Sequence, residues 1–299
     1  MKRWISLLLS VLFLPVLAAA EEESLSMPPA SWDFCGKTVR SYESETLIYS
    51  VESFSYEGEL CYLSKIWMED PGRQIRKATA SWKKNIMRPV HMADALPEAA
   101  LAVNASGYVS PVYPWIPEDY PGKSEDYFYT PLGSLTVTDG KVWRELEGVR
   151  YTGLTLEEDG LHLYMEEENS TVLAAGPTQT WAFYTQCPMQ VNGRVVLPED
   201  WTFADTKARR TVIGRADGHN YLILTVTNEK GRGLTLREVN RFFLDHFRLE
   251  WVFNLDGGPS IALLCRKKGG TGRMATVAGG TARDVDIMAF TELPGEGTE

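Results

Sequence analysis

The sequence has few of the residues that build metal centres and disulfide frameworks. Its 299 residues include four cysteines and four histidines, and they contain no CxxC, HxH or HExxH pattern. Structural and catalytic zinc sites use such closely spaced ligands, so the sequence does not indicate a zinc centre. In an oxidising compartment we expect one or two disulfides among Cys35, Cys61, Cys187 and Cys265, for which three pairings are possible.

The chain also lacks an excess of basic residues. Lysine and arginine together number 30 against 40 aspartates and glutamates, which gives a net charge of −10. Nucleic acids and anionic membrane surfaces select basic faces, so neither is expected as the main partner. The charge leaves room for a small anionic ligand held by a local group of arginines.

Only one apolar run is long, and it lies at the N-terminus. Residues 4–17 follow Lys2 and Arg3 and precede Ala18-Ala19-Ala20. This layout predicts a signal peptide over residues 1–20, cleaved after Ala20, and a secreted, extracytoplasmic protein without a transmembrane segment after signal removal. Residues 21–45 are acidic and rich in Ser and Pro and are interpreted as a leader, 46–293 as one folded domain, and 294–299 as a tail.

The folded part contains many short strand patterns and few helical ones. Apolar and polar residues alternate in the strand patterns, and Asp-Gly or other turn residues separate them. These patterns cover residues 46–54, 59–68, 135–142, 152–156, 161–166, 177–186 and 209–226. Helices are predicted around residues 87–99 and 234–247, the second with Thr235 and Glu238 as a capping box. We therefore predict an α+β fold, a single domain on a mixed, mainly antiparallel β-sheet with a few flanking helices.

The most informative stretch is a glycine-rich corner between two apolar runs, residues 251–255 and 261–264. Asp256, Gly257 and Gly258 form the corner. A carboxylate at the end of a buried strand, followed by residues that tolerate positive φ, can share one point with backbone N–H groups. Such a corner suits a binding or catalytic site, although an ordinary hairpin turn also favours Asp-Gly.

Three other features resemble parts of a site. The apolar strand 100–103 runs into Asn104, for which a turn asparagine is the simpler interpretation. Arg210, with Arg209 beside it, enters a predicted hairpin, and an arginine fork suits phosphate or carboxylate. Residues 108–131 are rich in proline, aromatic and acidic residues, as in a lid or binding loop or in a surface loop tied down by proline.

The order of these pieces resembles the phosphodiester glycosidase family. The resemblance rests on the strand into Asn104, on Arg210-Thr211-Val212-Ile213-Gly214, on Gly233-Leu234-Thr235-Leu236 before a helix, and on Asn254-Leu255-Asp256-Gly257-Gly258-Pro259-Ser260. It covers roughly residues 60–290. It implies an exported hydrolase that cleaves a sugar from a glycosyl-1-phosphodiester, with a phosphorylated glycan or glycosyl-phosphodiester as its partner.

The resemblance also implies roles for individual residues. Asp256 would be a catalytic carboxylate, Arg210 would hold the phosphate, and Asn104 would orient the sugar or phosphate. The substrate-binding residues would be Gly257, Gly258, Ser260 and Arg209, with the two glycines offering N–H groups to the phosphate. No cofactor and no metal are expected. The oxygens of Asp256 would suit a divalent cation such as calcium, but no acidic loop with ligand spacing surrounds it.

Glycoside cleavage usually uses two carboxylates, and the sequence does not single out the second. Glu69, Asp70, Asp205 and Asp217 are unranked candidates. The pair Asp284-Val285-Asp286 is interpreted as the solvent face of an edge strand, which makes a metal-dependent phosphodiester hydrolase the weakest alternative.

The main alternative is a catalytically inactive protein of the same fold that binds a carbohydrate or a cell-wall polymer. Pro259 stands where the family commonly has another glycine, and the aromatic loop between Tyr113 and Tyr129 would suit a binder. A cleft that holds aromatic residues and no second carboxylate would favour this alternative.

Overall fold

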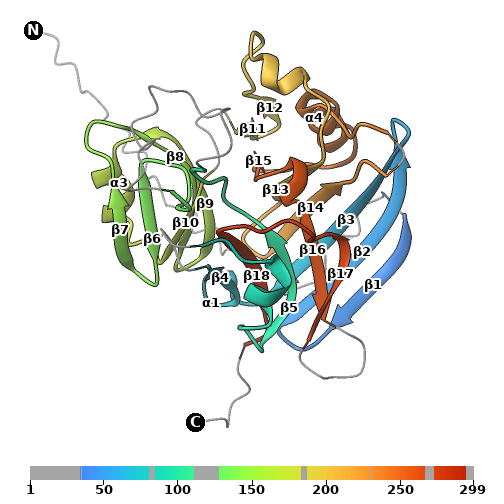
Figure 1. Cartoon of the computed structure of the whole chain (residues 1–299), viewed down its shortest axis with the longest axis horizontal. Helices are drawn as coiled ribbons and strands as arrows, with labels where there is room; N and C mark the ends of the chain where they lie inside the picture. Colours follow the sequence, from blue (N-terminus) through green and yellow to red (C-terminus); the bar gives the residue numbers. More distant parts are fainter. Residues whose placement is uncertain are drawn as a thin grey trace, which may run out of the picture.

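The computed structural model describes residues 34, 36–80, 85–110, 128–182, 187–229, 231–266 and 273–293. Their strands form three sheets, and every strand pair within these sheets is antiparallel (Figure 1). The predicted α+β class on antiparallel strands is confirmed. The strands are, however, divided among three sheets instead of being gathered into one.

The largest sheet has eight strands in the order β1-β2-β3-β14-β13-β15-β11-β12. Its strands are β1 (Lys37–Glu43), β2 (Leu47–Tyr56), β3 (Glu59–Met68), β11 (Pro188–Val191), β12 (Arg194–Val195), β13 (Arg210–Arg215), β14 (Asn220–Val226) and β15 (Trp251–Asn254). The predicted hairpins β2–β3 and β13–β14 are both present. Strand β1 lies inside the stretch 21–45 that we interpreted as a leader. It is an exposed edge strand of mostly polar residues, so it carries no apolar alternation that would reveal it.

The second sheet has five strands in the order β17-β16-β5-β18-β4. They are β4 (Ile75–Thr79), β5 (Ala99–Asn104), β16 (Ala262–Arg266), β17 (Met274–Gly279) and β18 (Asp286–Thr291). Strands β15 and β16 thus belong to different sheets. The corner at Asp256 passes from one sheet to the other, and the simpler interpretation as a hairpin turn is wrong.

The third sheet is formed by the strands predicted between residues 135 and 186, in the order β7-β6-β10-β8-β9. Its strands are β6 (Leu135–Thr138), β7 (Lys141–Glu145), β8 (Tyr151–Glu157), β9 (Gly160–Glu167) and β10 (Gln179–Trp181). In Figure 1 it stands beside the other two sheets, in green. Strand β10 is shorter than the predicted strand 177–186, of which residues 183–186 lie outside the described residues.

The helices are short except for α4. They are α1 (Pro71–Gln74), α2 (Pro89–Ala93), α3 (Asn169–Ala174) and α4 (Leu236–His246), with 3-10 turns η2 (Thr202–Asp205) and η3 (Gly258–Ser260). The capping box of Thr235 and Glu238 that opens α4 is confirmed. The helix predicted over 87–99 ends instead at Ala93, because Pro97 cannot continue it and β5 begins at Ala99. None of the described helices has the length and apolar composition needed to cross a membrane.

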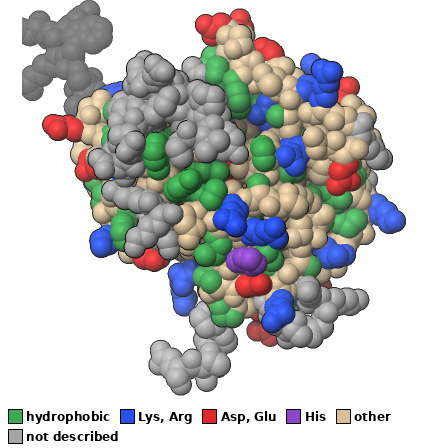
Figure 2. Space-filling view, in the orientation of Figure 1, with side chains coloured by type: hydrophobic (Ala, Val, Ile, Leu, Met, Phe, Trp, Pro, Cys, Tyr) green, Lys and Arg blue, Asp and Glu red, His purple; other side chains and the backbone are tan. Residues whose placement is uncertain are grey.

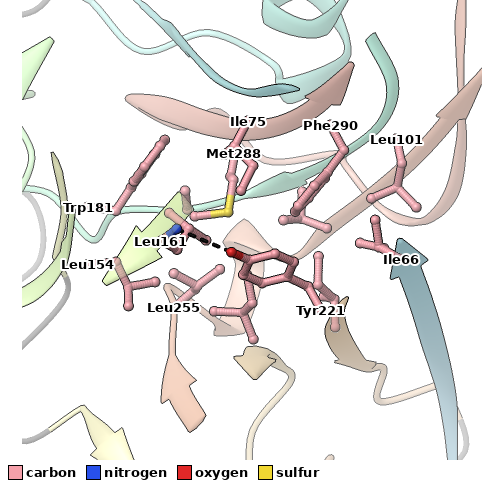
Figure 3. Close-up of a cluster of buried hydrophobic side chains, with 14 of the residues drawn as sticks. Ile66, Ile75, Leu101, Leu154, Leu161, Trp181, Tyr221, Leu255, Met288 and Phe290 are labelled. Carbon is pink, nitrogen blue, oxygen red and sulfur yellow. Dashed lines mark hydrogen bonds between the residues drawn. The ribbon is translucent and has the colours of Figure 1, made fainter. Parts of the chain in front are cut away.

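The main core lies between the sheets. In a strand that is buried on both faces, successive side chains point into two different cores, because side chains alternate along a strand. In β18, for example, Met288 and Phe290 face the main core, while Ile287 and Ala289 pack toward α2. Figure 3 shows side chains from all three sheets meeting around Tyr221, whose hydroxyl accepts a hydrogen bond from the backbone N–H of Leu161 at 3.2 Å.

Two smaller cores cover the outer faces of the sheets. Helix α4 packs Phe242 and Phe243 against the eight-stranded sheet, and α2 packs Met92 against the second sheet. On the face viewed in Figure 2 the acidic side chains lie apart from one another. The net charge of −10 is therefore not gathered into one acidic patch on this face.

The described cysteines do not pair. Cys61, Cys187 and Cys265 are buried, and the expected disulfides are not found among them. Cys35 lies outside the described residues.

Candidate active site

The site is built where the eight-stranded sheet meets the second sheet, β17-β16-β5-β18-β4. The corner after β15 is tied to the ends of the neighbouring strands by backbone hydrogen bonds. The N–H of Leu255 donates to the carbonyl of Thr211 at 2.9 Å, and the N–H of Asp256 donates to the carbonyl of Ala105 at 2.9 Å. Leu255 points into the main core (Figure 3), so the residue after it is anchored by packing as well.

The side chain of Asn104 holds this junction together by hydrogen bonds. Its side-chain Nδ2 donates to the carbonyl of Asp256 at 2.7 Å, and its Oδ1 accepts from the Thr211 hydroxyl at 2.7 Å and from the Ala262 N–H at 2.9 Å. The residue is fully buried and is not among the residues that line the cavity described next. The sequence correctly connected Asn104 with Asp256. In the structure the side chain holds the backbone of the corner, and its role in orienting the sugar or phosphate stays a prediction.

A cavity of about 190 Å³ opens beside the corner. Its walls come from η2 and the chain that leads to β13, from the corner itself, and from the chain after β5. The described residues that line it are Tyr108, Phe203, Thr206, Ala208, Arg210, Asp256, Gly257, Gly258, Pro259 and Ser260. The structure therefore brings Asp256 and Arg210 to the same cavity, as predicted. It adds Tyr108, the first residue of the stretch interpreted as a lid, binding or surface loop, and Phe203, which was not assigned to the site.

Arg210 is buried but has no acidic partner among the described residues. Only 2% of it is exposed. Its Nε donates to the carbonyl of Leu234 at 3.2 Å, its Nη2 donates to the carbonyl of Thr206, and its guanidinium lies 4.9 Å from the centre of the Phe203 ring. Burial lowers the pKa of Arg210 to about 10, so the group stays charged at neutral pH. A buried cation without a counter-ion favours an anionic ligand.

Asp256 is the carboxylate of the cavity, and 7% of it is exposed. Burial, and to a smaller extent the negative charge of Asp286, raise its pKa to about 7. Hydrogen bonds from the Ser260 side chain and the Gly257 N–H act in the opposite direction. The carboxyl group is thus poised to exchange a proton near neutral pH, as acid–base catalysis requires.

The N–H groups of Gly257 and Gly258 form hydrogen bonds within the protein, and the two glycines permit the tight backbone of the corner. The N–H of Gly257 donates to the carboxylate of Asp256 at 2.8 Å, and the N–H of Gly258 donates to the carbonyl of Arg209 at 2.9 Å. The prediction that these N–H groups hold the phosphate is therefore wrong. A Cβ at Gly257 would lie 2.7 Å from the carbonyl oxygen of Arg209, and Gly258 has a φ of +57°, so both positions require glycine.

Of the two remaining predicted binding residues, Ser260 lines the cavity and Arg209 does not. Ser260 lines the cavity and bonds the carboxylate of Asp256. Arg209 is half-buried, is absent from the described lining, and reaches the corner through its backbone carbonyl. The guanidinium of Arg210, and not that of its neighbour, belongs to the site.

None of the four candidates for a second carboxylate lies at the cavity. Glu69 and Asp70 line a separate hollow beside Arg215. Asp205 pairs with Arg237 on the surface, with 2.7 Å between Oδ1 and Nε. Asp217 shapes the β13–β14 turn by accepting from the N–H groups of His219 and Asn220 at 2.8 and 2.9 Å.

The carboxylates near Asp256 are instead those of Asp284 and Asp286. Both are fully buried, and the pKa of Asp284 is raised well above its usual value by burial and then by the charges of Asp256 and Asp286. The interpretation of this pair as a solvent face is wrong. The apolar run 287–290, which follows the pair, could have indicated this burial. Strand β18 is buried on both faces, and Asp286 is its first residue.

No group of three or more histidine, cysteine, aspartate or glutamate side chains among the described residues is arranged to hold a metal ion. The expected absence of a cofactor stays a prediction. The aromatic loop expected between Tyr113 and Tyr129 falls mostly in residues 111–127, outside the described part of the chain.

Comparison with protein families decides the affiliation of the chain. A model of the phosphodiester glycosidase family matches residues 98–288, which include Asn104, Arg210 and Asp256. The chain belongs to the phosphodiester glycosidase family. The resemblance inferred from the sequence is confirmed, and no curated protein matches the chain significantly.

Solved structures of the same fold support this affiliation. The catalytic domain of zebrafish N-acetylglucosamine-1-phosphodiester alpha-N-acetylglucosaminidase, auto-inhibited by its pro-peptide, is 14% identical with a TM-score of 0.60, and the match covers 87% of each chain. A hypothetical protein from Synechocystis is 13% identical with a TM-score of 0.56, over 83% of this chain and 63% of that protein. At such identities the likeness concerns the fold.

Proposed function

We propose that this member of the family is an exported hydrolase that releases a sugar from a glycosyl-1-phosphodiester. The observation that carries the proposal is the pairing of two groups at one small cavity. Arg210 is a buried cation without an acidic partner in the described chain, and Asp256 is a buried carboxyl whose proton is exchangeable near neutral pH. A substrate with an anionic phosphate next to a cleavable C–O bond uses both groups.

Arg210 binds the phosphate in this proposal. Its Nε and Nη2 are held by backbone carbonyls, which fixes the guanidinium plane, while Nη1 has no hydrogen-bond partner among the described residues and remains available. An arginine held in this way needs little reorganisation to stabilise the charge that grows on the leaving phosphate. The aromatic walls, Tyr108 and Phe203, offer flat apolar faces to the sugar.

Asp256 supplies the proton. As the bond between the anomeric carbon and the phosphate oxygen breaks, its electron pair moves to the oxygen and forms a phosphate monoester whose second pKa is about 6. The raised pKa of the Asp256 carboxyl lies close to that value, so proton transfer between them is nearly balanced, which suits general acid catalysis. The carboxylate left behind then takes a proton from the water that adds to the sugar carbon, and the cycle closes.

One observation favours the binding protein as a second candidate. Asp256 is the sole carboxylate in the described lining, and aromatic residues share that lining. A non-catalytic member of the family would keep the arginine and the aromatic walls for binding. Sugar release separates the two candidates, because only the enzyme consumes its ligand.

The experiment measures sugar release by the mature protein from a panel of glycosyl-1-phosphodiesters that differ in the sugar. We expect release from at least one substrate, a loss of about 10²- to 10⁴-fold in Asp256→Asn, and a comparable loss in Arg210→Ala. Arg209→Ala is the matched control, since its side chain does not line the described cavity. A chelator is expected to leave the rate unchanged. Saturable binding of a glycosyl-phosphodiester without any release would replace the enzyme by the binding protein.

A further inference from the structure

Neighbouring backbone groups of Ala105 and Ser106 form hydrogen bonds with two acidic residues, Asp256 and Asp286. It follows β5 and lies between the Asp256 corner and the start of β18. The carbonyl of Ala105 accepts from the N–H of Asp256 at 2.9 Å, and the N–H of Ser106 donates to Oδ1 of Asp286 at 2.7 Å. Asp284 and Asp286 are two residues apart at the start of β18 and are fully buried. Asp284 and Asp286 therefore lie behind the part of the cavity wall that Asp256 forms.

Asp286 has the surroundings of a permanent anion. Its Oδ2 lies 3.2 Å from Nζ of Lys77, and both side chains are fully buried. Lys77 is itself held by the carbonyl of Thr180 and by the Trp181 ring, whose centre is 5.3 Å from Nζ. A buried carboxylate with a cation on one oxygen and an N–H on the other is stable as an ion.

Asp284 has the surroundings of a neutral acid. Its Oδ1 accepts from the N–H of Val285 at 2.8 Å, and its Oδ2 has no hydrogen-bond partner in the part of the chain that the structure describes. No described lysine or arginine forms an ion pair with it. An isolated carboxylate is too costly to bury in this way, so the group keeps its proton.

We propose that Asp284 and Asp286 are positioning residues that set the protonation of Asp256, with Asp286 as a fixed anion and Asp284 as a neutral acid. The anion of Asp286 opposes ionisation of Asp256, and the neutrality of Asp284 keeps a further charge away from it. The catalytic meaning of this arrangement rests on the proposed function, in which Asp256 must hold a proton when the sugar–phosphate bond breaks.

The charged groups around the three carboxyls come from several elements. The negative charge of Asp286 raises the pKa of Asp256, and the charges of Asp256 and Asp286 raise the pKa of Asp284. Burial lowers the pKa of Lys77, on β4, while the charges of Asp286 and Asp139 raise it and that of Arg144 lowers it. The third sheet also contacts Lys77 through Thr180 and Trp181 of β10.

The test follows the Asp256 carboxyl directly, without substrate. The mature protein is labelled with ¹³C at the aspartate side-chain carboxyl, and the signal that disappears in Asp256→Asn is titrated with pH. We expect a midpoint near neutral pH in the wild type, a clearly lower midpoint in Asp286→Asn, and little change in Asp284→Asn, because an amide replaces a neutral acid. An unchanged midpoint in Asp286→Asn, or an equal decrease in Asp284→Asn, would overturn the proposal.

Asp286→Asn leaves Lys77 buried without its partner and so endangers folding. The double variant Lys77→Met with Asp286→Asn removes both charges and is expected to lower the midpoint as well. Asp245→Asn, an exposed aspartate of α4, is the matched control and should leave the midpoint in place. An unshifted midpoint in a folded double variant would also contradict the proposal.

Thermal unfolding gives a second readout for Asp284. In the unfolded chain this group ionises above pH of about 4, whereas in the folded protein it keeps its proton to a much higher pH. The wild type therefore loses stability as pH rises through this interval, and Asp284→Asn does not. The Tm of the variant minus that of the wild type should increase from pH 4 upward, and a difference independent of pH would contradict the neutral acid.

These measurements separate the inference from the proposed function. Both titrations use the free protein, so they hold or fail whether or not any sugar is released. Midpoints that behave as expected in a protein without glycosidase activity would refute the proposed function alone.

Discussion

At the scale of single residues, the site depends on burial more than on unusual residue types. Arg210 and Asp256 are common residues that become reactive because they face a small cavity from a nearly dry environment. Burial moves both pKa values toward neutrality, downward for the arginine and upward for the aspartate. In the proposed reaction, Arg210 is the cation that binds the phosphate and Asp256 holds the proton for the leaving group.

The raised pKa of Asp256 predicts the pH dependence of the reaction. The acid must be protonated when the bond breaks, so activity is present below its pKa and is lost as pH rises through about 7. We expect kcat to fall tenfold per pH unit on the alkaline side. The measurement is kcat against pH with a saturating substrate. A rate that stays constant from pH 6 to pH 9 would show that Asp256 is not the proton donor.

Sequence reasoning found the residues with a local signature and missed those whose role depends on the fold. Asp256, Gly257 and Gly258 form a recognisable corner, and Arg210 opens a clear hairpin. Asp284 and Asp286 lie in a short polar stretch whose burial follows from the packing of β18 between β4 and β5. The apolar run after them was the local sign of a buried strand, but the strands that cover it are set by pairing between distant segments.

At the scale of elements, the junction of the eight-stranded sheet with the second sheet positions the corner at Asp256. Asn104 connects β5, β13, β16 and the carbonyl of Asp256 through a single side chain. The sequence predicted β5 and the corner, but it did not reveal that β15 and β16 lie in different sheets. Sheet membership depends on pairing between distant segments, which neither propensity nor alternation encodes.

Asn104→Ala should destabilise the protein strongly. It leaves the Asp256 carbonyl, the Thr211 hydroxyl and the Ala262 N–H without their partner in a buried junction, and each such group costs about 1–3 kcal/mol. We expect a loss of roughly 3–5 kcal/mol in the free energy of unfolding, measured with denaturant. Thr235→Ala, which removes the cap of α4, is the comparison and should cost about 1 kcal/mol. Equal losses in the two variants would refute the claim that the Asn104 side chain holds the junction together.

At the scale of the whole molecule, the three sheets share one core while the site lies at the meeting of two of them. The large core was predictable from the many apolar strand segments, whereas the division into three sheets was not. The helix expected over residues 87–99 shows why: its apolar spacing fits a helix, yet Pro97 and the pairing of β5 with β16 and β18 favour a strand from Ala99. Tertiary pairing decided between two local possibilities.

Export is a prediction about the whole chain. Residues 1–20 lie outside the described part of the structure, so the proposal rests on their sequence pattern. In cells of its source, the mature protein should begin at Glu21 and be found outside the cytoplasm, because Ala18-Ala19-Ala20 suits signal peptidase. N-terminal sequencing of the purified protein checks this. Intact residues 1–20 on the cytoplasmic protein would contradict it.

The central claim is that the cavity couples a phosphate-binding arginine to an acid that assists cleavage of the sugar. The most direct measurement compares kcat/KM for the best glycosyl-1-phosphodiester with that for a methyl glycoside of the same sugar, in the wild type and in Arg210→Ala. The account predicts that the wild type prefers the phosphodiester by several orders of magnitude and that Arg210→Ala loses most of this preference. Equal rates for the two substrates, or a preference that survives in a folded Arg210→Ala variant, would contradict it.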